Sequence, residues 1–369
     1  MTSEGAESIT NPTPYERWML AQEVPIIHGY FAADVPNQPM ERWDRLGCPA
    51  TFLHLRGMEG RTAMYAVEIP PGGETRPIKH MYEQIVFVLK GQGRAEVRDA
   101  EGHVSELDWQ ETSMFGIPLN ASYTLKNTGS EPAYYLAATT APLVFDLFHS
   151  EDFVFNTNLE FKDRFDGRAD YYALDSRYGE TDHPLWDANL ITDVANAQIP
   201  AKEYRGSGYG SIQFEPAGNT LIGHMAQYPS GRYAKAHHHG GGALLVILRS
   251  TGYTLLWPSE LGLRPFSDGK GERVVRVDWK PGTVFSPPTG WFHQHFNSGP
   301  EPARQLALRY GSTKFPMGIH KAAGGVTRST SEGGTQIEYE DEDPEIRRLF
   351  ERETAARGVT VDMPAVSYR

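Results

Sequence analysis

The chain has 369 residues, a formal net charge of −12 and a single cysteine, Cys48. This charge balance, without a basic cluster, argues against nucleic acid or an anionic membrane as a partner. One cysteine excludes an intramolecular disulfide, and the sequence shows neither a signal-peptide pattern nor an apolar run of membrane-spanning length. We therefore expect a cytoplasmic protein. The length and the 39% hydrophobic content are sufficient for two or three domains.

Residues 1–50 form an N-terminal arm that is rich in Pro, Trp and Tyr, and residues 15–20 are expected to be a short helix. Its aromatic content predicts that the arm packs on the folded body or on another subunit, and we expect a homo-oligomer. Beyond the arm, Pro and Gly are abundant and helical patterns are rare. This composition favours many short strands joined by turns.

Two strand-rich regions follow, at about 51–145 and 187–315. The connection between them, 146–186, is acidic and aromatic, which is not typical of a flexible linker. We expect this connection to pack across both regions. In the second region the segment 258–271 has no counterpart in the first, and we expect it to form a loop over the functional site.

The tail, residues 316–369, contains three different patterns. Residues 321–334 are rich in Ser, Thr and Gly, which predicts a mobile segment. Residues 336–345 are strongly acidic, and we expect them to be solvated. Asp343 and Pro344 then begin an amphipathic pattern that predicts an N-capped short helix ending near Gly358.

The second strand-rich region contains two pairs of closely spaced histidines. His237 and His239 are two residues apart, so on a strand both imidazoles leave the same face. His293 and His295 have the same spacing, and they follow a tight turn expected at 288–290. Two strands that each present histidines on one face predict a metal site rich in nitrogen ligands. Such ligands suit Fe, Cu, Ni or Zn better than Mg or Ca.

These residues resemble the two cupin motifs. The first motif is matched by Gly231, His237 and His239, while Ala243 stands where a glutamate is usual. The second motif is matched at every position, by Gly282, Pro288, Gly290, His293 and Asn297. The resemblance implies an all-β fold of two tandem cupin barrels, also called double-stranded β-helix or jelly-roll barrels. It also implies a metal held by His237, His239 and His293.

The first strand-rich region contains a degraded copy of both motifs, which is an internal repeat. The aligned residues are His80 for His239, Gln84 for Ala243, Ile78 for His237, Tyr123 for His293 and Asn127 for Asn297. One histidine with a neutral amide is a poor ligand set. We therefore expect 51–145 to be a structural barrel and 187–315 to be the metal-binding barrel.

Three neutral imidazoles leave a divalent metal with its full charge, which favours an anionic chelating substrate. The set resembles the all-histidine cupins that use Fe(II) and O₂, among them thiol dioxygenases and the gentisate and salicylate ring-cleaving dioxygenases. The resemblance implies a non-haem Fe(II) dioxygenase that takes O₂ and a small anionic hydroxyaromatic acid. Two alternatives remain open. One is a redox-neutral hydrolase, decarboxylase or isomerase that uses Zn, Mn, Ni or Cu; the other is a bicupin that binds a small ligand without catalysis.

Strand parity suggests which side chains surround the metal. The candidates for catalysis are His295, Arg309 and Gln227, and the candidates for the substrate pocket are Trp257, Trp291 and Lys235. An arginine or lysine among them would pair with a substrate carboxylate. His238 is expected to point away from the barrel interior, because its neighbours on both sides point inward.

Overall fold

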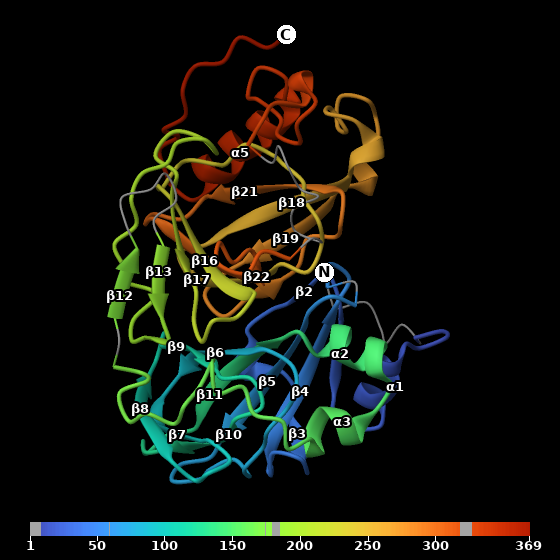
Figure 1. The fold of residues 1–369 in the computed structure, drawn as a ribbon. Coiled ribbons are helices and arrows are strands. Elements are labelled where there is room, and N and C mark those ends of the chain that lie inside the picture. Colours follow the sequence, from blue (N-terminus) through green and yellow to red (C-terminus); the bar gives the residue numbers. More distant parts are fainter. Residues whose placement is uncertain (1–8, 59, 174, 179–184, 318–326) are drawn as a thin grey trace.

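The computed structural model describes residues 9–58, 60–173, 175–178, 185–317 and 327–369. It consists of two β-barrels, one above the other in Figure 1, joined by a connection along one side. Within these ranges no helix has the length and apolar character needed to cross a membrane. Residues 179–184 of the expected inter-barrel connection and residues 321–326 of the segment expected to be mobile lie outside the described residues.

The first barrel, at the bottom of Figure 1, combines a sheet of eight strands with a sheet of three. The large sheet has the order β1-β4-β5-β11-β6-β9-β14, with β3 paired to β4, and the small sheet has the order β10-β7-β8. The strands are β1 (Ile26–Gly29), β3 (Glu41–Trp43), β4 (Cys48–Leu55), β5 (Ala63–Ile69), β6 (Gln84–Lys90), β7 (Gln92–Arg98), β8 (Val104–Gln110), β9 (Met114–Ile117), β10 (Ser122–Asn127), β11 (Ala133–Thr139) and β14 (Leu190–Ile191).

The second barrel has the same construction. Its large sheet has the order β12-β13-β15-β16-β22-β17-β20-β2, and its small sheet has the order β19-β18-β21. The strands are β2 (Phe31–Ala32), β12 (Asp175–Tyr178), β13 (Leu185–Ala188), β15 (Gly210–Phe214), β16 (Leu221–Tyr228), β17 (Leu244–Arg249), β18 (Gly252–Pro258), β19 (Val275–Trp279), β20 (Val284–Phe285), β21 (Trp291–Asn297) and β22 (Ala303–Tyr310).

The two barrels exchange short strands and share one apolar core. Strand β2 of the arm pairs with β20 of the second barrel, while β14, which leads into the second barrel, pairs with β9 of the first. Leu306 and Leu308 of β22 belong to the same buried cluster as Phe115 of β9. A Cβ on Gly223 would lie 2.8 Å from the side chain of Met114, so the two sheets are in close contact. This packing holds the barrels in one fixed arrangement.

Helices cover the outer ends of the barrels. They are α1 (Pro14–Leu20), α2 (Ala141–Phe148) and α3 (Glu151–Asn156) beside the first barrel, α5 (Pro344–Ala356) above the second, and the 3₁₀ helices η1 (Val35–Asn37), η2 (Ser259–Leu261), η3 (Gly271–Arg273) and η4 (Thr330–Glu332). Helix α1 begins with a capping box between Thr13 and Glu16. Trp18 of α1 stacks on Phe145 of α2 with ring centroids 4.8 Å apart, so the arm packs on the first barrel.

The acidic tail segment is partly buried, which corrects the expectation of a solvated run. Gln336, Glu342 and Asp343 are at most 2% exposed. The backbone at 335–337 pairs with 236–238, through His238 N donating to Thr335 O and Ile337 N donating to Ala236 O. The acidic composition did not show this burial, because the buried carboxylates are satisfied by distant partners. Asp343, for example, caps α5 and also accepts from the amides of Phe266 and Ser267.

The segment 258–271 packs against α5 and not over the histidines. Leu261 and Phe266 belong to a cluster with Phe292 of β21 and Ile346 of α5, which lies on the outer face of the β18–β21 pair. The segment lies there because it covers two apolar surfaces, the apolar face of α5 and the outer face of the β18–β21 pair. The expectation of a loop over the functional site is therefore wrong for this segment.

Glu342 should make stability depend on pH. Tyr233 Oη donates to its Oε1 over 2.5 Å and Gln294 Nε2 donates to its Oε2 over 3.0 Å, but burial raises the pKa of this carboxyl to about 7. Between pH 4.5, the usual pKa, and pH 7 the unfolded chain loses this proton while the folded protein keeps it. The contribution of Glu342 to the free energy of unfolding should thus fall by about 3 kcal/mol as pH rises through this window.

The Glu342→Gln variant should lose this pH dependence, because an amide does not ionise. Urea unfolding of both proteins from pH 4.5 to 8 measures the effect. The stability of the wild type should fall relative to that of the variant up to pH 7. The buried histidines, whose pKa values burial lowers, raise the stability of both proteins over much of this window and cancel in the difference. A difference that stays constant with pH would show that Glu342 does not cause the fall.

Candidate metal centre

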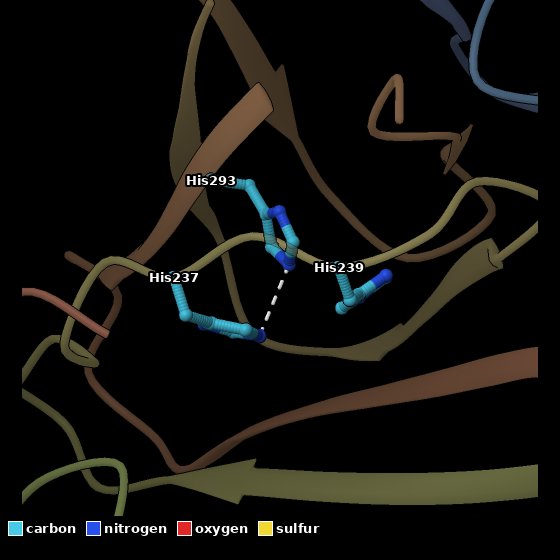
Figure 2. A group of neighbouring side chains, drawn as sticks. All are labelled: His237, His239 and His293. Atoms are coloured by element: carbon cyan, nitrogen blue, oxygen red, sulfur yellow. Dashed lines mark hydrogen bonds between the residues drawn. The ribbon is translucent and has the colours of Figure 1, made fainter. Parts of the chain in front are cut away.

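Three histidines from two neighbouring segments meet at one end of the second barrel. His237 and His239 lie on an extended segment between β21 and residues 335–337, and His293 lies on β21 (Figure 2). His237 and His293 form a backbone pair, in which the amide of each donates to the carbonyl of the other over 3.1 and 2.9 Å. Contrary to the expectation of a regular strand, the segment bearing His237 makes only isolated bridges, because it divides its backbone hydrogen bonds among several neighbours.

The ligand atoms of these three imidazoles lie within 4.8 Å of one another. Nε2 of His237 and Nε2 of His293 are 3.1 Å apart, and their side chains point toward the same space in Figure 2. Two nitrogens bound at right angles to one metal, each about 2.1 Å from it, would be about 3.0 Å apart. The observed separation therefore fits two adjacent positions of one metal ion.

The backbone sets the tautomer of each imidazole. Nδ1 lies 3.4 Å from Lys235 O in His237, 2.7 Å from Gly240 O in His239 and 3.3 Å from Trp291 O in His293. Each carbonyl can only accept, so a proton on each Nδ1 satisfies these contacts and leaves Nε2 available as a metal ligand. This is the ligand tautomer that metal-binding histidines adopt. The 3.1 Å contact between Nε2 of His237 and Nε2 of His293 is a hydrogen bond when one of the two nitrogens is protonated, and a bound metal would take the place of that proton.

The electrostatic environment keeps the imidazoles neutral. Burial, the Arg205 guanidinium and the neighbouring imidazoles hold the pKa of His237 well below its usual value. Burial and the imidazoles of His239 and His295 do the same to the pKa of His293. Neutral imidazoles are required for metal ligation. The site is therefore prepared for a metal across the whole physiological pH range.

The interior of the second barrel keeps some solvent exposure at positions where that of the first keeps none. Ala226, Leu245 and Ala307 face the second interior and are still 6%, 7% and 8% exposed. Their counterparts by strand pairing in the first barrel, Val67, Val86 and Ala137, are all 0% exposed. At these matched positions solvent therefore reaches the interior of the second barrel and not that of the first.

Side chains with hydroxyl and amide groups occupy the corresponding site of the first barrel. Tyr65 Oη donates to Gln84 Oε1, and Gln84 Nε2 donates to Tyr123 Oη, both over 2.8 Å. His80 Nδ1 lies 2.8 Å from Tyr82 O, and its buried Nε2 has no hydrogen-bond partner among the described residues. Burial lowers the pKa of His80 to about 4. A single imidazole beside phenols is consistent with the expectation of a structural barrel.

Three of the other predicted site residues lie inside the second barrel. Arg309 follows Ala307 on the inward face of β22, and Trp291 packs at the mouth, with its ring centroid 5.6 Å from that of Tyr30. His295 lies deeper, with Nδ1 2.9 Å from Thr254 Oγ1. Burial and Arg205 lower the pKa of His295 to about 3, so its imidazole is neutral.

Three predicted site residues are not brought to the histidines. Gln227 accepts a hydrogen bond from Arg304 on the outer face of β16, and Trp257 packs against Phe292 on the outer face of β18. Lys235 forms an ion pair with Glu338 of the tail. His238 also points outward, with its ring centroid 4.9 Å from that of Phe292. Gln227 and Trp257 are each one residue out of phase with the inward-facing positions, which reverses the face that a side chain occupies.

No sequence pattern indicates Arg205, the most buried positive charge near the histidines. It is 6% exposed, precedes β15 and accepts a backbone hydrogen bond from Lys235 N over 2.7 Å. Its Nη1 donates to Gln336 Oε1 of the tail over 2.6 Å. Arg205 lies in an irregular segment 32 residues before His237, where no periodic pattern or motif marks it. Only the three-dimensional structure reveals its position.

Comparison with known proteins supports the fold. Residues 65–139, which lie in the first barrel, match the cupin domain family. The oxalate decarboxylase of Lactobacillus farciminis, solved as a formate complex, is similar with a TM-score of 0.50 and 12% identity, over 76% of this chain and 86% of that chain. The chain has a bicupin fold.

A variant of Bacillus subtilis oxalate decarboxylase is similar to this bicupin with a TM-score of 0.48 and 12% identity, over 77% of this chain and 79% of that chain. No curated protein matches the sequence. At such low identity the likeness concerns the fold alone. The prediction of an all-β fold with two tandem cupin barrels, an N-terminal arm and a short C-terminal helix is confirmed.

Proposed function

We propose that the second barrel is a metal-dependent active site for a small anionic acid. The observation that supports this most directly is a group of three imidazoles, with ligand atoms within 4.8 Å of one another, beside the buried guanidinium of Arg205. His237, His239 and His293 would hold a divalent transition metal. When bound, such a metal polarises the oxygens of a carboxylate and stabilises negative charge that develops on them.

The other inward-facing residues bind and orient the acid. Arg205 and Arg309 offer guanidinium groups, which suit a carboxylate better than an ammonium does because they present paired N–H donors. His295 acts as a hydrogen-bond donor. Trp279 Nε1 donates to Thr254 Oγ1, so the Thr254 hydroxyl directs its proton to His295 Nδ1, and the proton of His295 is on Nε2.

The reaction that we propose is redox-neutral, with decarboxylation as its first candidate. Solved structures that share the bicupin fold include oxalate decarboxylases, one of them with formate. In this chain Ala243 replaces the usual cupin glutamate, so a carboxylate of the substrate would meet no anionic ligand at the metal. Mn(II) and Fe(II) are the first metals to test, since imidazole ligands accommodate both.

The test is an assay of the protein loaded separately with Mn(II) and Fe(II), against oxalate, malonate and a panel of hydroxybenzoates. We expect CO₂ release without net consumption of O₂ for at least one acid. Stoichiometric O₂ uptake with a hydroxybenzoate would instead establish the ring-cleaving dioxygenase. Saturable binding of an acid without turnover would establish the non-catalytic binding protein.

A further inference from the structure

Gln305 is a buried amide without a partner inside the second barrel. It lies on the inward face of β22, paired with Ala226 of β16 and Ile247 of β17. Its side chain is 1% exposed, and neither Nε2 nor Oε1 has a hydrogen-bond partner within the described ranges. Leaving both groups unsatisfied destabilises the folded protein, so the amide calls for an explanation. Proteins retain a destabilising group of this kind mainly where function requires it, as in a binding site.

The surroundings of Gln305 give a ligand access to it. Its inward-facing neighbours Ala226 and Ala307 are small, and they are among the interior residues that keep some exposure. At the corresponding position of the first barrel stands Tyr135, beside Val67, and that interior is filled. The second barrel therefore has a smaller polar side chain, beside two alanines that keep some exposure, where the first barrel has a phenol.

Strand geometry places Gln305 at the deep end of the interior. Arg309 lies four residues further along β22, on the same face and toward the end where Ala243 and the three histidines lie. At about 3.3 Å per residue, the two backbone positions are roughly 13 Å apart. A substrate held at the metal by its carboxylate would thus direct its other end toward Gln305.

We propose that Gln305 recognises this other end, and that this end carries a hydroxyl or carboxamide group. The amide offers one donor, Nε2, and one acceptor, Oε1. A second carboxylate can only accept, and it would leave Oε1 unpaired and facing a negative charge. A neutral group with both a donor and an acceptor satisfies the whole amide. This inference rests on the proposed function, because it assumes an acid bound at the metal.

The experiment compares isosteric probe pairs on Mn(II)-loaded protein by calorimetry. The pairs are 3-hydroxybenzoate with 3-methylbenzoate, and succinamate with 4-oxopentanoate. Wild type should bind the hydroxyl or carboxamide member of at least one pair more tightly, by roughly tenfold, since the methyl-bearing member lacks the donor and leaves Oε1 of the amide unpaired. Gln305→Leu and Gln305→Met should lose this preference and bind the methyl-bearing member at least as tightly.

Two further measurements separate recognition from a structural role. The metal-free Gln305→Leu variant should unfold at the same temperature as wild type or higher, because an unsatisfied amide has been removed. The control is Gln227→Leu, because Gln227 faces outward on β16 and accepts a hydrogen bond from Arg304. This variant should lose stability and keep the preference for the hydroxyl or carboxamide probe. The inference about Gln305 would be overturned if wild type bound both members of each pair equally, or if both Gln305 variants kept the preference. Either result would leave the proposed function intact. Failure of every acid to bind would overturn the proposed function as well.

Discussion

His293→Ala should abolish metal retention and activity while leaving the second barrel folded. The variant removes one of three Nε2 donors, and the remaining pair, His237 and His239, lies on one segment only. Loss of groups that merely support metal ligands reduces metal affinity or activity by 10- to 100-fold, so loss of a ligand should exceed about 100-fold. Metal content after gel filtration and turnover of the acid found in the assay measure the two effects.

The matched control is His238→Ala, which removes the imidazole between two of the proposed ligands. Its ring contacts Phe292 on the outer face, so metal content and turnover should remain within about twofold of wild type, as for other surface changes. Circular dichroism and thermal unfolding of both metal-free variants verify folding. Full metal occupancy in the His293→Ala protein would show that His293 is not a ligand.

The second cupin motif could be identified from the sequence because its residues fix local backbone geometry. Asn297 Nδ2 donates to Glu301 O and Asn297 Oδ1 accepts from Gly299 N, and Asn127 makes the equivalent bonds with Glu131 O and Gly129 N in the first barrel. Gly282 and Gly290 have positive φ angles of 85° and 71°, which glycine adopts without steric cost. Requirements of this kind act over a few residues and leave a pattern at fixed spacing.

The remaining features of the site depend on contacts between distant segments, which leave no such pattern. Gln336 reaches the site because residues 335–337 pair with 236–238, about a hundred residues earlier. The acidic composition that follows Gln336 predicts solvated surface, and only the packing of α5 reveals its burial. Strand parity gave Arg309 the correct face but misplaced Trp257, because a register error of one residue exchanges the inner and outer faces.

Arg205→Gln should reduce substrate affinity strongly without removing the metal. The guanidinium is 6% exposed, and it is the charge that most lowers the pKa values of His237 and His295 after burial itself. A charged hydrogen bond to a buried carboxylate contributes about 1.5–3 kcal/mol, so KM should rise roughly 10- to 150-fold. Metal content should hold or rise, because a positive charge near the metal has been removed. Arg205→Lys should recover only part of the affinity, since an ammonium lacks the planar pair of donors.

An electrostatic readout distinguishes this role of Arg205 from a purely structural one. The pKa of His295, about 3 in the wild type, should rise in Arg205→Gln but stay below its usual value of 6.5, because burial is its largest cause and remains. NMR titration of the imidazole in metal-free protein measures this shift. Arg304→Gln is the control, because Arg304 is similarly buried at 9% exposure but donates to Ala195 O and Ala197 O outside the barrel interior. Arg304→Gln should lower stability and leave KM and the His295 titration unchanged. An unchanged KM in Arg205→Gln would show that the Arg205 guanidinium does not bind the substrate.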